Sequence, residues 1–180
     1  TMTKGLTFNP DSLTVKTGTS TLSKDTDYTV DVNSTPDTDG NTNFKVTFKD
    51  SYLNTIDSDT DIVVSYTATV NKNAEIGTTT GNTNTAQLKY GNKSTVDSKT
   101  TTYSYKFDLV KTDNSKKLLT GAKFKLYDTK DSNTPVELIK DAATGNYRVA
   151  EKNEDGAVKE IEIDSFKAVT ISGLNKKTYY

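Results

Sequence analysis

Apolar residues alternate with polar ones along most of this 180-residue chain, and this period of two constrains the fold more than any other feature. Successive side chains of a β-strand point to opposite faces, so alternation predicts strands with one buried face. No stretch has the apolar spacing of three and four that is typical of an amphipathic helix. The 33 Thr and ten Tyr residues favour pleated, half-buried strands. The sequence therefore predicts an all-β protein.

The alternating segments form two sets, each interrupted by Asp, Asn, Ser, Thr and Gly residues that favour turns. The first set comprises residues 5–8, 13–15, 28–32, 44–48, 62–70 and 83–90. The second comprises residues 103–111, 122–127, 136–139, 147–150, 161–163, 169–171 and 178–180. Residues 91–102 have almost nothing to bury and are interpreted as a linker or a final edge strand. We therefore expect tandem immunoglobulin-like β-sandwiches, with domains at residues 1–101 and 102–180.

The residue types that are missing exclude most familiar active sites. The chain contains no His, the commonest catalytic base, and no Cys, the source of a thiolate nucleophile. These two residues are also the usual ligands of transition metals. A net charge of −1 gives no field that would attract nucleic acid, and no apolar run approaches the roughly 18 to 20 residues of a membrane helix. We expect no cofactor, no metal, no nucleic acid, no membrane partner and no enzymatic activity toward a substrate.

One lysine stands where the alternation predicts a buried residue. In the segment 103–111, Tyr105, Phe107 and Leu109 share one face, and Lys111 continues that face inward. Burial would favour the neutral, nucleophilic form of the amine, which amide chemistry requires. The alternative is that the strand ends at Leu109 and that the Lys111 side chain reaches water.

An asparagine has a corresponding place in the first domain. Asn84 is in phase with Ala86, Leu88 and Tyr90 on the predicted inner face. A carboxamide that faces an unprotonated lysine, with a carboxylic acid to polarise it, can lose ammonia and become a Lys–Asn isopeptide bond. The alternative is a hydrogen-bonded asparagine of the core or of a turn.

Several motifs in order resemble one protein family. The segments FDLVKTDNSKKLLTGAKFKLYD, YRVA and ISGLNKKTYY resemble the collagen-adhesin B-type domain of Gram-positive backbone pilins. The earlier segments MTKGLTF, DYTV, IVVSYTATVNKNAEIG and NTAQLKY resemble the isopeptide-forming middle domain of the same shaft pilins, so the resemblance implies tandem collagen-adhesin A-type/B-type pilin domains. The resemblance spans nearly the whole chain. It implies a structural shaft subunit of a surface pilus.

The resemblance also implies roles for individual residues. Lys111 would be the amine of the crosslink in the second domain, and Asn84 the acceptor in the first. The partners that the family uses would lie before Thr1 and after Tyr180, so we expect both domains to be incomplete in this sequence. Lys4 and Asp50 are in-chain substitutes, because each shares the parity of an apolar strand face.

The family also implies partners and a location. We expect covalent head-to-tail polymerisation with other copies through a sortase, at a cell-wall-anchored, extracellular pilus (fimbrium). The alternatives are a surface adhesin or tip pilin that binds host matrix or glycan through its loops, and an accessory module of a secreted hydrolase.

The acidic segments DTDGNTN and DSDTD faintly resemble calcium loops, but neither has the downstream bidentate Glu, and solvated turns are the preferred interpretation.

Overall fold

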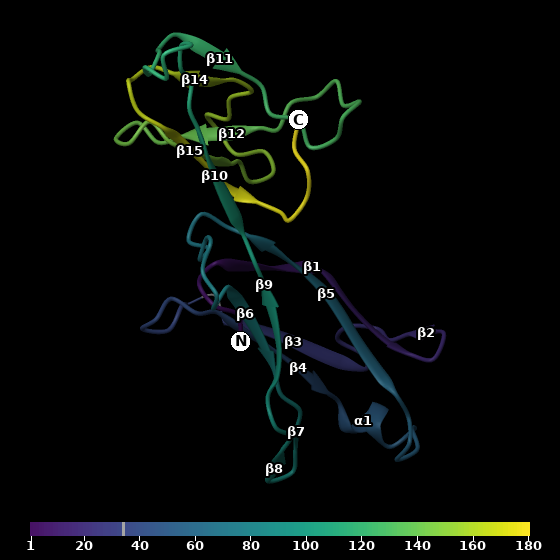
Figure 1. Ribbon diagram of the computed structural model, residues 1–180. Helices are drawn as coiled ribbons and strands as arrows, with labels where there is room; N and C mark the ends of the chain where they lie inside the picture. The colour runs from purple at the N-terminus through teal and green to yellow at the C-terminus, as the bar shows by residue number, and fades with distance from the viewer. Residues whose placement is uncertain (34) are drawn as a thin grey trace. The chain divides into compact units, whose positions relative to one another are not determined.

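The computed structural model describes residues 1–33 and 35–180 of the chain. Among these residues the regular structure consists of fifteen strands and one helix of four residues (Figure 1). The prediction of an all-β fold is confirmed. The described residues divide into two units, one formed by residues 1–73 and 82–101, the other by residues 74–81 and 102–180. The predicted domain limits of 1–101 and 102–180 stay a prediction, and residues 74–81 are the segment on which the two divisions differ.

The first unit is built from short sheets. Its elements are β1 (Leu6–Thr17), β2 (Ser20–Thr21), β3 (Tyr28–Asn33), β4 (Asn43–Phe48), α1 (Asp50–Leu53), β5 (Ile62–Val70), β6 (Asn82–Ala86), β7 (Lys89–Tyr90), β8 (Lys93–Ser94) and β9 (Ser98–Thr102). One antiparallel sheet has three strands in the order β2-β1-β5. The other strands of this unit form two-stranded sheets, namely β3-β4, β6-β9 and β7-β8. Alternation predicted the exact span of β5.

Strand β1 joins two segments that were expected to be separate strands. Its pairing with β5 shifts register between Asn9 and Thr14, where Pro10 lacks the N–H that a regular ladder needs. The hydroxyl of Ser12 bridges the irregularity, since it donates to the Asn9 carbonyl (2.7 Å) and accepts from the Thr67 N–H (2.8 Å). The two predicted strands are therefore one strand with a bulge.

The first three residues add a short antiparallel pairing to β6. The Thr3 N–H donates to the Thr83 carbonyl (3.0 Å), and the Thr85 N–H donates to the Thr1 carbonyl (2.8 Å). Between these bonds Met2 pairs with Asn84 on one side and with Thr42 on the other. The Met2 side chain is fully buried. This pairing fixes the backbone of β6 at Asn84.

The second unit is a β-sandwich with a continuous core. Its strands are β10 (Tyr105–Leu109), β11 (Ala122–Phe124), β12 (Leu138–Lys140), β13 (Tyr147–Val149), β14 (Ile161–Ile163) and β15 (Val169–Leu174). One sheet has the order β10-β15-β13-β12, and β11-β14 form the second. Side chains from both sheets make one buried cluster: Leu126, Leu138, Tyr147, Ile161, Ile163, Val169, Ile171 and Leu174.

The structure corrects two predicted inner faces. Leu88 and Tyr90 were expected to be buried, but 57% and 54% of their surfaces are exposed, because they lie along the β7-β8 hairpin. Tyr105 and Phe107 are also exposed, by 38% and 37%, since β10 is an edge strand of its sheet. Alternation groups these side chains on one face, but it does not say whether another layer covers that face.

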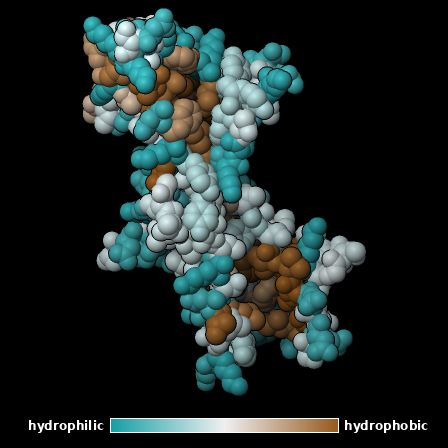
Figure 2. All heavy atoms as spheres, viewed as in Figure 1, coloured by the Kyte–Doolittle hydropathy of each residue, from teal (hydrophilic) through white to brown (hydrophobic). Residues whose placement is uncertain are grey.

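The first unit keeps several large apolar side chains exposed. Figure 2 shows apolar surface gathered on the first unit where β3 and β5 lie. Val32 on β3 and Val63 on β5 are exposed by 39% and 56%, and Leu53 at the end of α1 by 43%. Most of the remaining apolar side chains of β3, β4 and β5 are half-buried.

Candidate crosslinking site

Asn84 lies near the middle of β6, and its side chain is half-buried. Its carboxamide Nδ2 donates a hydrogen bond to the Tyr66 Oη at 2.5 Å. Tyr66 belongs to β5, which is in a different sheet, so this bond joins two sheets of the first unit. The prediction that Asn84 turns toward the interior agrees with this placement, although Ala86, Leu88 and Tyr90 beyond it are exposed.

An aromatic cluster holds Tyr66 in place. Phe8 of β1 and Phe44 of β4 stack with ring centroids 4.1 Å apart and planes 6° apart. The Tyr66 ring meets both edge-on, at 5.6 Å from Phe8 and 4.8 Å from Phe44. Edge-to-face contacts of this kind are favourable because the positive ring edge meets a negative ring face. The Asn84 carboxamide therefore contacts a phenol whose ring is fixed by apolar neighbours.

Lys111 lies just beyond the strand that was expected to contain it. β10 ends at Leu109, and the Lys111 side chain is exposed, with Nζ 3.3 Å from the Thr112 carbonyl to which it donates. The expectation that Lys111 continues the buried face is therefore wrong in this structure. The backbone at this point is held by the Leu119 N–H, which donates to the Lys111 carbonyl (2.9 Å). The assignment of Lys111 as a crosslinking amine stays a prediction.

The two in-chain substitutes lie outside the strands. Lys4 lies in the turn before β1, and its Cβ and Cδ lie beside Gly40. The chain leaves β4 at Phe48, and Asp50 begins α1 with its side chain exposed. Asp50 therefore does not extend the inner face of β4, as the alternation had suggested. The roles considered for Lys4 and Asp50 remain untested.

The first acidic loop is a hydrogen-bonded turn. The Asp37 carboxylate accepts the backbone N–H of Asn41 (2.8 Å), its side-chain amide (3.0 Å) and the N–H of Asp39 (2.9 Å). These bonds, with the Asn41 backbone N–H first, lower the pKa of Asp37 below its usual value. Within residues 1–33 and 35–180, no group of three or more carboxylates is placed to hold a metal.

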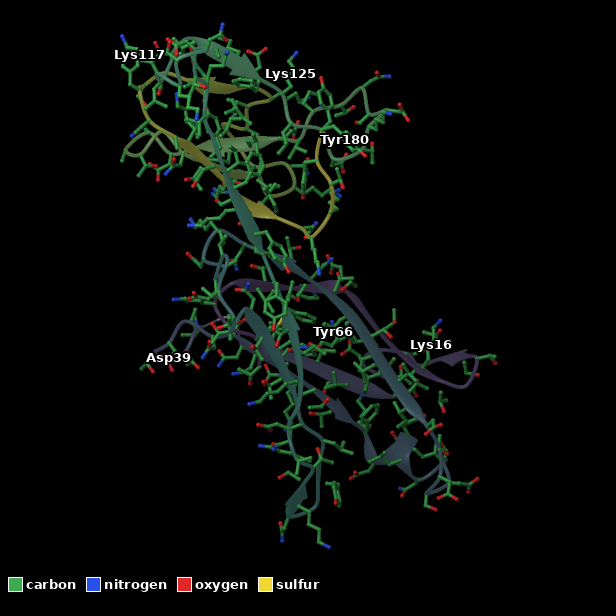
Figure 3. All side chains as sticks on the ribbon, in the orientation of Figure 1. Lys16, Asp39, Tyr66, Lys117, Lys125 and Tyr180 are labelled. Carbon is green, nitrogen blue, oxygen red and sulfur yellow. The ribbon has the colours of Figure 1, made fainter. Side chains whose placement is uncertain are left out.

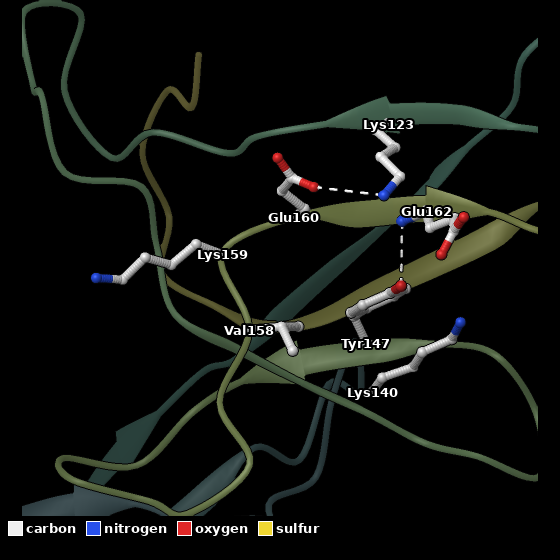
Figure 4. A pocket seen from close by; sticks show the side chains of 7 residues that line it. All are labelled: Lys123, Lys140, Tyr147, Val158, Lys159, Glu160 and Glu162. Carbon is white, nitrogen blue, oxygen red and sulfur yellow. Dashed lines mark hydrogen bonds and ion pairs between the residues drawn. The ribbon is translucent and has the colours of Figure 1, made fainter.

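A shallow pocket of about 380 Å³ on the second unit was not predicted from the sequence. Figure 4 shows its seven lining side chains. Each of its three lysines has a carboxylate partner: Lys123 with Glu160 (3.8 Å), Lys140 with Asp164 (2.7 Å) and Lys159 with Glu137 (3.4 Å). The Tyr147 Oη accepts the Glu162 N–H at 3.1 Å. Each lysine that lines the pocket therefore has a carboxylate close to its amine.

The fold and the site together define a class of protein, namely a modular all-β protein of two units, the first of which has a half-buried asparagine that links two sheets. Consistent with this class, the chain belongs to the family described as Gram-positive pilin backbone subunit 2, Cna-B-like domain, which matches residues 1–94. That family consists of structural pilin subunits rather than enzymes, as the sequence predicted. The resemblance to backbone pilins is thereby confirmed.

A solved structure has a similar fold. It is described as the crystal structure of the major pilin GBS80 of Streptococcus agalactiae, 35 kDa C-terminal fragment. The TM-score is 0.62 at 21% identity, and the match covers 96% of this chain and 64% of that chain. The comparison with curated proteins found no match. Across the residues that the structure describes, no helix has the length and hydropathy required to cross a membrane.

Sequence reasoning identified Asn84 but missed its partner. Tyr66 has the same parity as Val64 and Val70 in β5, and a tyrosine on an apolar face usually has a hydrogen-bond partner for its hydroxyl. That signal predicts that a partner exists. It does not identify Asn84, which lies on another sheet.

Proposed function

We propose that the chain is part of a shaft subunit of a Gram-positive surface pilus, braced by intramolecular Lys–Asn isopeptide bonds at Asn84 and Lys111. The observation that carries the proposal is the half-buried Asn84 carboxamide, which β6 directs toward Tyr66 within the aromatic cluster. A carboxamide held in such a place loses little freedom when an amine attacks it. Membership in the backbone pilin family supports the same role.

The bond at Lys111 needs a second element in this proposal. The Lys111 side chain is exposed, whereas attack on a carboxamide needs a neutral amine. A further strand beside the edge strand β10 would cover it and supply the acceptor asparagine and the acid, as the family resemblance implies. Covering the amine would favour its neutral form by desolvation.

The proposed function is mechanical. Polymerised head to tail through a sortase and anchored at the cell wall, the subunits would transmit tension, and a covalent tie between early and late strands would prevent those strands from separating. By the argument used for disulfides, such a tie also limits the entropy of the unfolded chain, by about 3 to 5 kcal/mol for long loops. The chain lacks cysteine, so an amide would take the place of a disulfide.

The test is intact mass with peptide mapping of the full-length polypeptide. We expect the loss of one ammonia per domain, and crosslinked peptides that contain Asn84 and Lys111. Asn84→Ala should abolish the first loss, whereas Asn92→Ala, a change at an exposed asparagine, should leave it intact. Unmodified peptides at both residues would overturn the proposal.

The adhesin alternative has one observation in its favour. Leu88, Tyr90 and Val96 are exposed by 57%, 54% and 90% around the β7-β8 hairpin. Exposed apolar and aromatic side chains can anchor a protein partner. The test is binding to immobilised host matrix proteins. If Leu88→Ser and Tyr90→Ser abolish this binding, the adhesin role is favoured. If binding survives both changes, the exposed side chains of the hairpin do not support that role.

A further inference from the structure

The hydrogen bond between Asn84 and Tyr66 involves the atom that the proposed reaction expels. Nδ2 of Asn84 is the nitrogen that would leave as ammonia, and it lies 2.5 Å from the Tyr66 Oη. Both side chains are half-buried in the first unit, in which Figure 3 labels Tyr66. The phenol is therefore already in contact with the leaving group before any amine arrives.

We propose that Tyr66 is a catalytic residue for isopeptide formation at Asn84, orienting the carboxamide and then protonating its departing nitrogen. This inference rests on the proposed function, because it requires that Asn84 reacts. It assigns a role to a residue on β5, a strand separate from the one that carries the acceptor.

The direction of the hydrogen bond would reverse during the reaction. In the planar amide the nitrogen lone pair is delocalised, so Nδ2 can only donate, and the phenol oxygen accepts. When the unprotonated amine of a lysine adds to Cγ, that carbon becomes tetrahedral and Nδ2 gains a localised lone pair. The Tyr66 O–H then becomes the donor and can pass its proton to Nδ2 across the same short distance.

The atoms and charges of this sequence balance. Nζ of the lysine forms a bond to Cγ, and the carbonyl π electrons move to the oxygen. Tyr66 gives its proton to Nδ2, the oxygen electrons return, and the Cγ–Nδ2 bond breaks with release of neutral ammonia. The new amide nitrogen then gives its extra proton to the phenolate. The net change is one lysine N–H proton transferred to ammonia, with Tyr66 regenerated.

The aromatic cluster makes Tyr66 suitable for this step. Its ring packs nearly perpendicular to the Phe8 and Phe44 rings, at 80° and 81°, while its hydroxyl contacts Asn84 of β6. These rings cover part of the half-buried phenol and lower the local dielectric, which strengthens its hydrogen bond to Asn84. A proton donor that is prepositioned in this way contributes about 10²-fold to 10⁴-fold to a rate.

The experiment compares full-length polypeptides that carry Tyr66→Phe or Tyr52→Phe. Both changes remove a single hydroxyl from a tyrosine of the first unit and keep the ring. Each protein is made by cell-free synthesis, and intact mass is followed over time, with the product mapped to the Asn84 peptide. Tyr66→Phe should slow the loss of ammonia about 10²-fold, and Tyr52→Phe should not change it.

The outcomes separate this inference from the proposed function. If Asn84 crosslinks in the wild type and equally fast in Tyr66→Phe, the role of Tyr66 is overturned and the proposed function stands. If Asn84 never reacts in the wild type, both fail. In an Asn84→Ala background, which cannot react, Tyr66→Phe should leave the melting temperature unchanged. A large drop there would show that the slower reaction reflects lost packing, and would overturn the catalytic role.

Discussion

Tyr52 carries one of three side-chain hydroxyls that, among the described residues, are buried without a hydrogen-bond partner. Its ring lies in α1 with 9% of the residue exposed, and it packs 6.2 Å from the Phe48 ring. A hydroxyl that loses water and gains no partner costs about 1 to 3 kcal/mol. The ring therefore stabilises the first unit, while its oxygen opposes folding.

Tyr52→Phe should raise the free energy of unfolding by about 1 kcal/mol, because it removes the unpaired oxygen and keeps the ring. Urea denaturation measures the change. Tyr66→Phe is the matched control, since it removes a hydroxyl that does form a hydrogen bond and should not stabilise the protein. A decrease in stability for Tyr52→Phe would show that its hydroxyl has a partner in solution.

The Lys140–Asp164 pair gives the second unit a predictable dependence on pH. The hydrogen bond from Lys140, 2.7 Å long, lowers the pKa of Asp164 from 3.8 in the folded protein. The stability that the Asp164 carboxylate contributes is therefore fully present above pH 3.8, and it is lost as the pH falls through the lowered pKa of Asp164. At high pH the partner group matters, because the same bond raises the pKa of Lys140 above 10.5. The stability that Lys140 contributes is therefore lost only as the pH rises through this raised pKa.

Asp164→Asn should flatten the acid side of the stability profile of the second unit, with a small effect because both side chains are partly exposed. Urea midpoints measured between about pH 6 and about pH 2 show the slope. Lys140→Gln should flatten the same region, since the low pKa of Asp164 depends on Lys140. An unchanged slope in both variants would mean that the pair does not persist in solution.

Among the elements, β15 depends on a glycine as well as on its alternating core residues. The register with β10 shifts so that Gly173 lies between the paired residues Ser172 and Leu174. Its φ of +79° is in the region that L-residues rarely adopt, and a Cβ there would lie 3.3 Å from the Val149 N. Gly173 therefore allows β15 to bulge against β10 while it lies close to β13.

Gly173→Ala should destabilise the second unit by about 1 to 3 kcal/mol, through the positive φ and the close contact with β13. Gly121→Ala is the matched control, because its φ is +81° and no atom lies within 4 Å of the added Cβ. The difference between the two variants in urea denaturation isolates the cost of the close contact. Equal costs would show that β13 moves aside freely.

Predictions from the sequence succeeded best at the level of elements. Alternation found β5 exactly and placed β3, β4, β13 and β14 within a residue or so, since the period of a strand is a local property. It predicted two strands where β1 is one, because Pro10 indicates the end of a strand when the partner strand is unknown. It also missed α1, a single turn too short to show a helical period.

At the scale of the whole molecule, the two units differ in how they bury apolar surface. The second has eight buried side chains in one cluster from both sheets. In the first, the buried residues include Met2, Leu6, Val15, Tyr28 and Tyr52, and β3 and β5 keep exposed apolar positions. Units with separate cores are expected to unfold as separate transitions.

Ile171→Ala should lower the stability of the second unit by about 2 to 5 kcal/mol, because its fully buried side chain leaves a cavity. In calorimetry, one transition should move to lower temperature while the other stays in place. Val15→Ala, at a fully buried position of the first unit, should move the other transition. A single transition that shifts with either change would show that the units unfold together.

The sequence alone determined the all-β class, most of the strands, the family resemblance and the inward direction of Asn84, because alternation and short motifs are local properties. Only the tertiary structure decided that Asn84 contacts Tyr66, that Lys111 is exposed, and that β10 and the β7-β8 hairpin leave apolar faces uncovered. These features depend on which strands become neighbours. Which strands become neighbours depends on packing between segments far apart in the chain, and the alternation within one strand does not determine it.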